Sequence, residues 1–269
     1  MKKYISSSWL LILFAAFTFT LTGCDKEGCT DPNAINFDEK ADTNDGSCEY
    51  ATGTAMLHLH PKWGDDPFAY GTDYMLDDGR VINFNIARFY MSQFTLLSDA
   101  GETALSEVYH QFTPSQDHYM LGSVNTGNYT GVRFVLGVDE TNNTGDPSIW
   151  PDDHVLSINY PTFDHWNWNM GYVFMKVEGN VDGTTPQTGT ADSTFVFHVG
   201  TQTMARTVTI NSTVTIAEGG TGMFHIDVDM KDVFEGLDMS QDLDTHTGNN
   251  VPLATQVADN FAIAVHAEE

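Results

Sequence analysis

Hydrophobic and polar residues alternate along much of the chain after residue 50. Residues 54–60 place small and aliphatic side chains on one face and two histidines, His58 and His60, on the other. This period of two is typical of a half-buried strand. Similar patterns predict further strands at 81–97, 129–139, 163–179, 194–200, 207–216 and 223–230. In the last of these, His225 falls on the polar face, opposite Phe224 and Ile226.

The pattern changes to a helical period near the end of the chain. Leu253, Val257 and Phe261 are spaced four apart within 251–264, with Pro252 near the first helical position and Asn250 as the expected N-cap. Many short strands with one terminal helix predict an all-β fold. We expect an antiparallel β-sandwich of the Ig-like or Greek-key type with a short C-terminal helix.

The stretch 163–179 is unusually aromatic. Trp166 and Trp168 are two apart, so they share a face of an extended strand. If the strand continues past Met170, Tyr172 and Phe174 join that face. Core packing is the favoured interpretation of the pair. A surface that binds sugar or peptide through the exposed aromatic strand is the alternative.

The N-terminal residues 1–23 have the features of an export signal. Lys2 and Lys3 precede a short apolar run, and small residues precede Cys24. This arrangement resembles a bacterial lipoprotein signal of the Bacteroidota type, in which Cys24 carries lipid. A transmembrane helix fits less well because the run is short for a bilayer. We expect a protein of the cell envelope, attached to the outer membrane through this lipid only, with exposure at the cell surface as the form that the Bacteroidota-type signal favours.

Residues 24–50 form an acidic, turn-rich spacer bracketed by Cys29 and Cys48. Two cysteines in an exported chain favour a disulfide bond. Carboxylate and amide oxygens here are potential calcium ligands, but their spacing is not that of an EF-hand. A solvated spacer is the preferred interpretation. The following residues, 51–269, show no repeat or linker and predict one domain.

The chain is strongly acidic, and this limits its partners. Its formal net charge is −26, and removal of Lys2 and Lys3 with the signal takes it to −28. Such a surface repels nucleic acid and anionic lipid headgroups and attracts cations. Motifs of nucleophilic hydrolases, metalloproteases and phosphate-binding enzymes are absent from the sequence, so an enzyme is not expected. A zinc-dependent hydrolase is the least favoured alternative.

Histidines are the candidate metal ligands. His58 and His60 share a strand face, His165 precedes the tryptophan pair, and His198 lies within a strand. Imidazole suits copper and zinc, and copper binds most tightly among the first-row divalent ions. Each histidine taken singly is better explained as a hydrogen-bonded surface or core residue, and the His58–His60 pair makes a metal ligand an equal alternative.

Six motifs in the same order resemble the MbnP-type copper-binding proteins. They lie at 60–68, 87–92, 127–139, 164–172, 197–200 and 258–261. The fourth is the Trp-x-Trp-x-x-Gly-Tyr element, in which Asp164 stands where the family has methionine.

The resemblance implies a secreted or lipid-anchored β-sandwich that binds copper. It also implies a di-haem, peroxidase-like partner of the MbnH type, which oxidises a tryptophan to kynurenine. By position, His60 and His198 would be the histidine ligands and Trp166 or Trp168 the modified ring. His58 and His165 are additional candidates.

Overall fold

The computed structural model describes residues 25–167 and 170–268. These form two compact units that divide after Tyr50, and each is described by itself. The predicted signal, Cys24 and Trp168 lie outside the described residues.

The first unit is a small disulfide-closed segment. Strand β1 (Glu27–Gly28) pairs in parallel with β2 (Thr43–Asn44). The Cys29–Cys48 disulfide predicted from the sequence is confirmed, with a Cα–Cα distance of 4.7 Å. Asp31 caps its own turn by accepting hydrogen bonds from the backbone N–H of Asn33 at 2.9 Å and from the hydroxyl of Tyr50 at 2.7 Å. Local turns of this kind give the segment order without a large hydrophobic core.

The second unit is built on two sheets, of which the larger has ten strands. Its main path is β14 (Arg206–Ile216), β10 (Gly127–Leu136), β6 (Val81–Ser98), β12 (Gly171–Val181), β13 (Ser193–Gly200) and β16 (Asp244–Thr245). Four short strands pair at its margins: β5 (Tyr74–Met75), β7 (Gly101–Ala104), β8 (His110–Phe112) and β11 (His165–Asn167). The long strand β6 holds this sheet together, because it pairs with β10, β12 and three of the short strands.

The smaller sheet has five strands. They are β17 (Val265–Ala267), β15 (Thr221–Asp229), β3 (Thr52–Trp63), β4 (Asp66–Pro67) and β9 (His118–Asn125). The prediction of an all-β sandwich is confirmed, with two exceptions to its antiparallel pattern: the short edge strand β16 pairs in parallel with β13, and the second exception lies in the smaller sheet. Strands β3 and β15 run parallel and in register over nine residue pairs.

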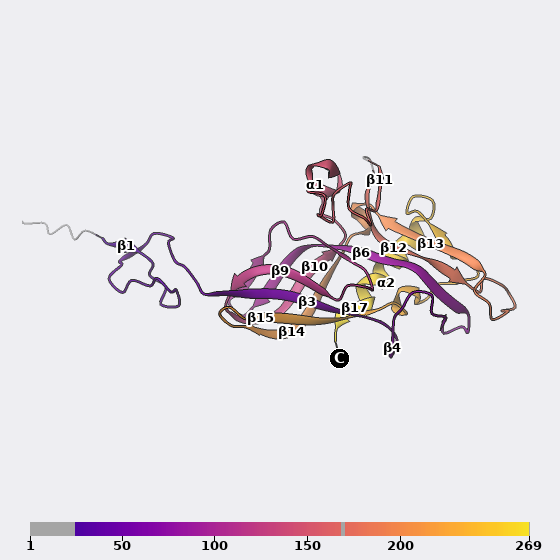
Figure 1. The fold of residues 1–269 in the computed structure, drawn as a ribbon, viewed down its shortest axis with the longest axis horizontal. Helices are drawn as coiled ribbons and strands as arrows, with labels where there is room; N and C mark the ends of the chain where they lie inside the picture. Colours follow the sequence, from indigo (N-terminus) through magenta and orange to yellow (C-terminus); the bar gives the residue numbers. More distant parts are fainter. Residues whose placement is uncertain (1–24, 168–169, 269) are drawn as a thin grey trace, which may run out of the picture. The chain divides into compact units, whose positions relative to one another are not determined.

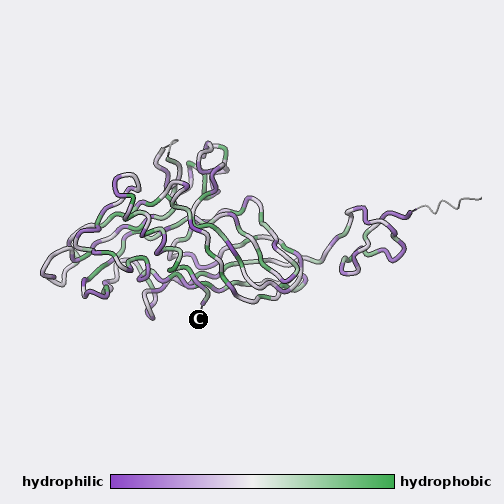
Figure 2. The backbone as a smooth tube through the Cα atoms, turned by 180° about the vertical axis from the view of Figure 1, so that it is seen from behind, coloured by the Kyte–Doolittle hydropathy of each residue, from purple (hydrophilic) through white to green (hydrophobic). Residues whose placement is uncertain are grey.

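One hydrophobic core lies between the two sheets. Leu57 and Leu59 of β3 and Phe224 of β15 are fully buried, as are Phe195 and Phe197 of β13. Figure 1 shows the two layers of strands, and Figure 2 shows hydrophobic and hydrophilic residues alternating along many of them. Alternation along each strand therefore leaves polar side chains on the outward face of each sheet.

Helix α2 (Val251–Ala264) packs against strands of both sheets. The helix prediction is confirmed, including its cap: the Asn250 side chain accepts a hydrogen bond from the Leu253 N–H. The remaining helical turns are short: α1 (Glu140–Asn143), η1 (Pro147–Ile149), η2 (Gln202–Met204) and η3 (Asp232–Phe234). Within the described ranges, no helix has the length and apolarity needed to cross a membrane.

The aromatic stretch is a hairpin, so the expectation of one continuous strand is wrong. Strand β11 folds back on β12, with His165 opposite Tyr172 and Asn167 opposite Gly171. Gly171 has φ of 73°, a conformation that favours glycine. Tyr172 and Phe174 are fully buried and belong to the core. Trp166, the described member of the tryptophan pair on which the sugar- or peptide-binding alternative rests, is half-buried.

Candidate metal centre

The outward face of the five-stranded sheet carries a row of four ligand-type side chains. The parallel register of β3 and β15 places His58 opposite His225. The antiparallel pairing of β9 with β3 places His118 opposite His58 on the other side. At the far edge, the backbone N–H of Glu268 donates to the carbonyl of His225 at 3.3 Å and continues the β17–β15 pairing by one residue. Strand pairing alone thus aligns groups from four separate parts of the sequence.

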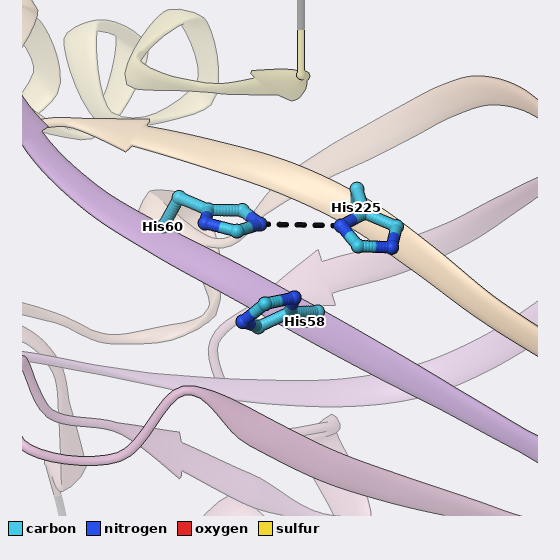
Figure 3. Close-up of side chains that lie close together, drawn as sticks. All are labelled: His58, His60 and His225. Carbon is cyan, nitrogen blue, oxygen red and sulfur yellow. Dashed lines mark hydrogen bonds between the residues drawn. The ribbon is translucent and has the colours of Figure 1, made fainter.

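Three imidazoles of this face converge. His58, His60 and His225 each offer a ring nitrogen, and the three nitrogens lie within 4.8 Å of one another. The Nε2 atom of His60 is 3.3 Å from the Nδ1 atom of His225, and Figure 3 shows both rings beside that of His58. We call His58, His60 and His225 the histidine triad.

The carboxylate of Glu268 borders the triad. Its Oε2 atom is 3.2 Å from Nδ1 of His225 and 3.8 Å from Nε2 of His60. A tetrahedral ion with bonds of about 2.0–2.1 Å to nitrogen or oxygen needs ligand atoms about 3.3 Å apart. His60, His225 and Glu268 therefore already have nearly the spacing of three ligands around one ion.

A second group of ligand-type side chains shares His58 with the triad. His58, Asp117 and His118 also offer ligand atoms within 4.8 Å of one another. The rings of His58 and His118 are stacked with centroids 4.2 Å apart. Asp117 Oδ1 lies 2.6 Å from Nδ1 of His118, so it orients that ring. A pocket of about 410 Å³ adjoins these residues and includes His58, His60 and Asp117 in its lining.

The electrostatics of the cluster favour neutral imidazole at His58. Burial lowers the pKa of His58 below its usual range, and the surrounding imidazoles lower it further. Its Nδ1 atom is buried and has no hydrogen-bond partner among the residues that the structure describes. A neutral ring with an unused buried nitrogen fits a metal ligand, because a metal binds the deprotonated form.

The convergence of His60 with His198 that the resemblance implied is wrong. His60 lies on the outward face of the five-stranded sheet, whereas His198 lies on β13 of the ten-stranded sheet. On β13, the neighbours Phe197 and Val199 are fully buried, so His198 also faces outward, away from the core. The core of the sandwich therefore separates the two imidazoles.

His198 has its own surroundings on that sheet. Its Nε2 atom is 2.7 Å from Oε1 of Glu178, and its ring lies 4.6 Å from that of His246. Burial lowers the pKa of His198, and the Glu178 carboxylate opposes this effect. His198 therefore has a carboxylate and an imidazole as neighbours on the ten-stranded sheet, separate from the triad.

Trp166 and His165 also lie at the ten-stranded sheet. The ring of Trp166 occupies the space beside Gly200, where an added Cβ would come within 2.8 Å of the indole. Gly200 is two residues from His198 on β13. The His165 ring packs against Phe163 and Tyr172 at centroid distances of 5.4 and 4.8 Å. Neither Trp166 nor His165 is on the sheet that holds the histidine triad.

Sequence reasoning found His58 and His60 but did not select their partners. Alternation placed His225 on the polar face of its strand, which is a necessary condition but does not identify a ligand. His118 lies on β9, a strand that the sequence did not predict, and Glu268 is one of many carboxylates.

Comparison with known proteins supports the fold and the family. The structure is similar to that of MbnP from Methylosinus trichosporium, with a TM-score of 0.54 and 15% sequence identity, over 77% of this chain and 87% of that protein. At this identity the match shows a shared fold. No curated protein sequence matches the chain. Residues 52–251, about three quarters of the 269 residues, match the MbnP family model, so the chain belongs to the MbnP family.

Proposed function

We propose that this protein binds a copper ion at the histidine triad. The observation that carries the proposal is the convergence of the His58, His60 and His225 nitrogens within 4.8 Å on one sheet face. Membership of the MbnP family, which is associated with copper binding, supports the choice of metal.

The donor set agrees with copper. Imidazole binds copper in both common oxidation states, and copper(II) has the highest affinity among the first-row divalent ions. Glu268 supplies a harder oxygen donor beside the same nitrogens. A carboxylate ligand would favour the divalent ion, and the three imidazoles alone suffice for the monovalent one. The net charge of −26 also raises the local concentration of cations.

A comparison of single variants tests the ligand assignment. We expect His225→Ala and His60→Ala each to weaken copper binding at least tenfold in a competition titration with a chelator, because each removes one of few ligands. His198→Ala is the matched control, since that histidine lies on the other sheet, and it should leave the affinity unchanged. Loss of binding in His198→Ala with normal binding in His225→Ala would reject the triad in favour of the ligands implied by motif position.

The family resemblance also supports a finer proposal, in which a di-haem partner of the MbnH type oxidises Trp166 or Trp168 to kynurenine. Kynurenine has a carbonyl and an aniline nitrogen that indole lacks, so it offers new donors. An oxidised Trp166 would present them beside His198, because the indole packs against Gly200 of the same strand. It would not be a ligand of an ion at the triad.

Intact-mass analysis tests the modification. Protein produced with and without a co-expressed di-haem partner should differ by the tryptophan-to-kynurenine mass change. Identical masses in both preparations would contradict this part of the proposal and would leave the triad unaffected.

We further propose that the protein is anchored in the cell envelope through lipid on Cys24. The lipoprotein-type signal in residues 1–23 supports this location. Metabolic labelling with a fatty acid should mark the wild type, and Cys24→Ser should abolish the label. Labelling that persists in the variant would rule out Cys24 as the lipidated residue.

A further inference from the structure

A row of three methionines lies beside the row of histidines on the five-stranded sheet. Met56 of β3 is the register partner of Met223 on β15. Met56 is also the register partner of Met120 on β9. The residues are two positions from His58, His225 and His118 on the same three strands, so they share the outward face. We call Met56, Met120 and Met223 the methionine row.

The burial pattern confirms that these side chains point away from the core. The neighbours of Met56, Ala55 and Leu57, are fully buried, whereas Met56 is half-buried. Met120 is 62% exposed although its neighbours Tyr119 and Leu121 are buried. A large apolar side chain exposed to this degree has no role in the core. Met56 and Met223 are half-buried on the same outward face beside Met120.

The spacing of the row suits a shared ion. Neighbouring strands lie about 4.8 Å apart, and directly opposed residues have Cβ atoms about 4.5–5.5 Å apart. A three-coordinate ion with metal–sulfur bonds of about 2.3 Å needs its sulfur atoms about 4 Å apart. Met120 and Met223 flank Met56 and are two strand spacings apart, about 10 Å, so both side chains must bend toward Met56 to share one ion. Methionine has three rotatable bonds, which allow this without moving the strands.

Thioether sulfur is a soft, neutral donor that selects monovalent copper over zinc, calcium or magnesium. We propose that Met56, Met120 and Met223 form a second metal site, specific for a soft monovalent ion such as Cu(I). Two residues along a strand span about 7 Å, so this site lies roughly that far from the row of histidines. The methionine row takes up the ion at the surface, and the histidines then receive it as stronger donors.

Binding at the methionine row does not depend on the proposed function, but its role as an entry site rests on copper binding at the triad. The two can therefore fail separately. In the transfer, metal–sulfur bonds break and metal–nitrogen bonds form, and the oxidation state of the ion does not change, because neutral sulfur ligands are exchanged for neutral nitrogen ligands.

The test uses the mature full-length chain labelled with ¹³C at its methionine methyl groups and titrated with Ag(I), a redox-stable stand-in for Cu(I). We expect the methyl signals of Met56, Met120 and Met223 to shift together and to saturate with one equivalent. Substituting all three by leucine should reduce the total bound Ag(I) or Cu(I) by one equivalent. Leucine has nearly the same volume as methionine, so the strands should remain folded. The single variant Met120→Leu, at the most exposed position, provides a second variant that keeps the fold.

Met75→Leu is the matched control, because Met75 is 64% exposed but lies on β5 of the ten-stranded sheet. It should leave stoichiometry unchanged. A variant with alanine at all three positions of the triad separates the two proposals: it should lose the histidine-bound equivalent and keep the methionine shifts. Unshifted methionine-row signals in the wild type, or unchanged stoichiometry in the triple leucine variant, would overturn the methionine site.

Discussion

Asp164 is the position at which the chain departs from the family motif, and its environment allows a quantitative prediction. The carboxylate is 6% exposed. Nη2 of Arg88 donates to it at 2.9–3.0 Å and Nζ of Lys176 at 3.1 Å. Asp164 thus joins two cations that are themselves only 16% and 19% exposed. We consider the substitution Asp164→Asn, which keeps the shape of the side chain and removes its charge.

The expected loss of stability follows from leaving two mostly buried cations without their shared counter-ion. Removal of one partner from a buried ion pair costs about 3–5 kcal/mol. Lys176 retains the Glu178 carboxylate at 3.4 Å, and both cations keep some contact with water, which reduces the penalty. We therefore expect Asp164→Asn to lower the free energy of unfolding by ~2–4 kcal/mol. This is a large part of the ~5–15 kcal/mol typical of a domain.

Urea unfolding at neutral pH, followed by tryptophan fluorescence, measures this difference. Glu102→Gln is the control, because Glu102 pairs with Arg133 at the surface, where the two side chains are 57% and 34% exposed. Exposed pairs contribute little, so the control should unfold at the wild-type midpoint. A difference below about 1 kcal/mol for Asp164→Asn would refute the reasoning, since that is the range of a surface ion pair.

A triple variant examines the cause of the loss. Methionine at Arg88, Asp164 and Lys176 removes all three charges together. Replacing a complete buried ion network by apolar side chains is often neutral. This variant should therefore be more stable than Asp164→Asn, although it differs from the wild type at more positions. If it is less stable, contacts other than charge pairing control this region.

Three further predictions concern stability. A threonine hydroxyl and backbone N–H groups hold the pKa of the buried Asp182 well below its usual range, so the stability that its carboxylate contributes is present above about pH 4 and is lost at lower pH. The difference in urea midpoint between the wild type and Asp182→Asn should therefore shrink from pH 7 to pH 2. A constant difference would contradict this. Gly179→Ala should lower the free energy of unfolding by at least ~2 kcal/mol, because the added methyl would overlap a backbone oxygen of β6. Gly248 has open space around it, so Gly248→Ala should leave the free energy of unfolding nearly unchanged in the same urea assay. Substituting Cys29 and Cys48 by serine should increase proteolytic cleavage within residues 25–50. The thermal midpoint of residues 51–269 should stay unchanged, because the disulfide lies wholly within the first unit. A lowered midpoint would contradict this prediction.

Local patterns predicted most of the elements. The strands around 54–60, 81–97 and 223–230 and the helix at 251–264 were found because alternation and capping act between residues close in sequence. Strand β9 was missed: its residues His118–Asn125 include Gly122 with φ of 119° and do not keep a regular alternation. The β11–β12 hairpin was read as one strand, because a glycine at Gly171 is compatible with either a strand or a turn.

The candidate site was predictable in part. Alternation showed that His58 and His60 face away from the core, and it placed His225 on a polar face. It could not show that β3 and β15 are neighbours, because almost the whole domain separates them in sequence. Motif order pointed instead to His198, which the core of the sandwich separates from His60.

In the strands that it predicted, the sequence by itself determined which side chains are buried and which face outward, since that depends on the period of two along each strand. It also determined the acidic charge, the disulfide-forming cysteines and the terminal helix. Only the tertiary structure decided which outward faces adjoin one another. Strand order and register are set by packing between distant segments, and a shift of one residue would turn every histidine of β3 or β15 to the opposite face. The alignment of His58 with His225, and of Met56 with Met223 and Met120, is therefore a property of the folded sheet.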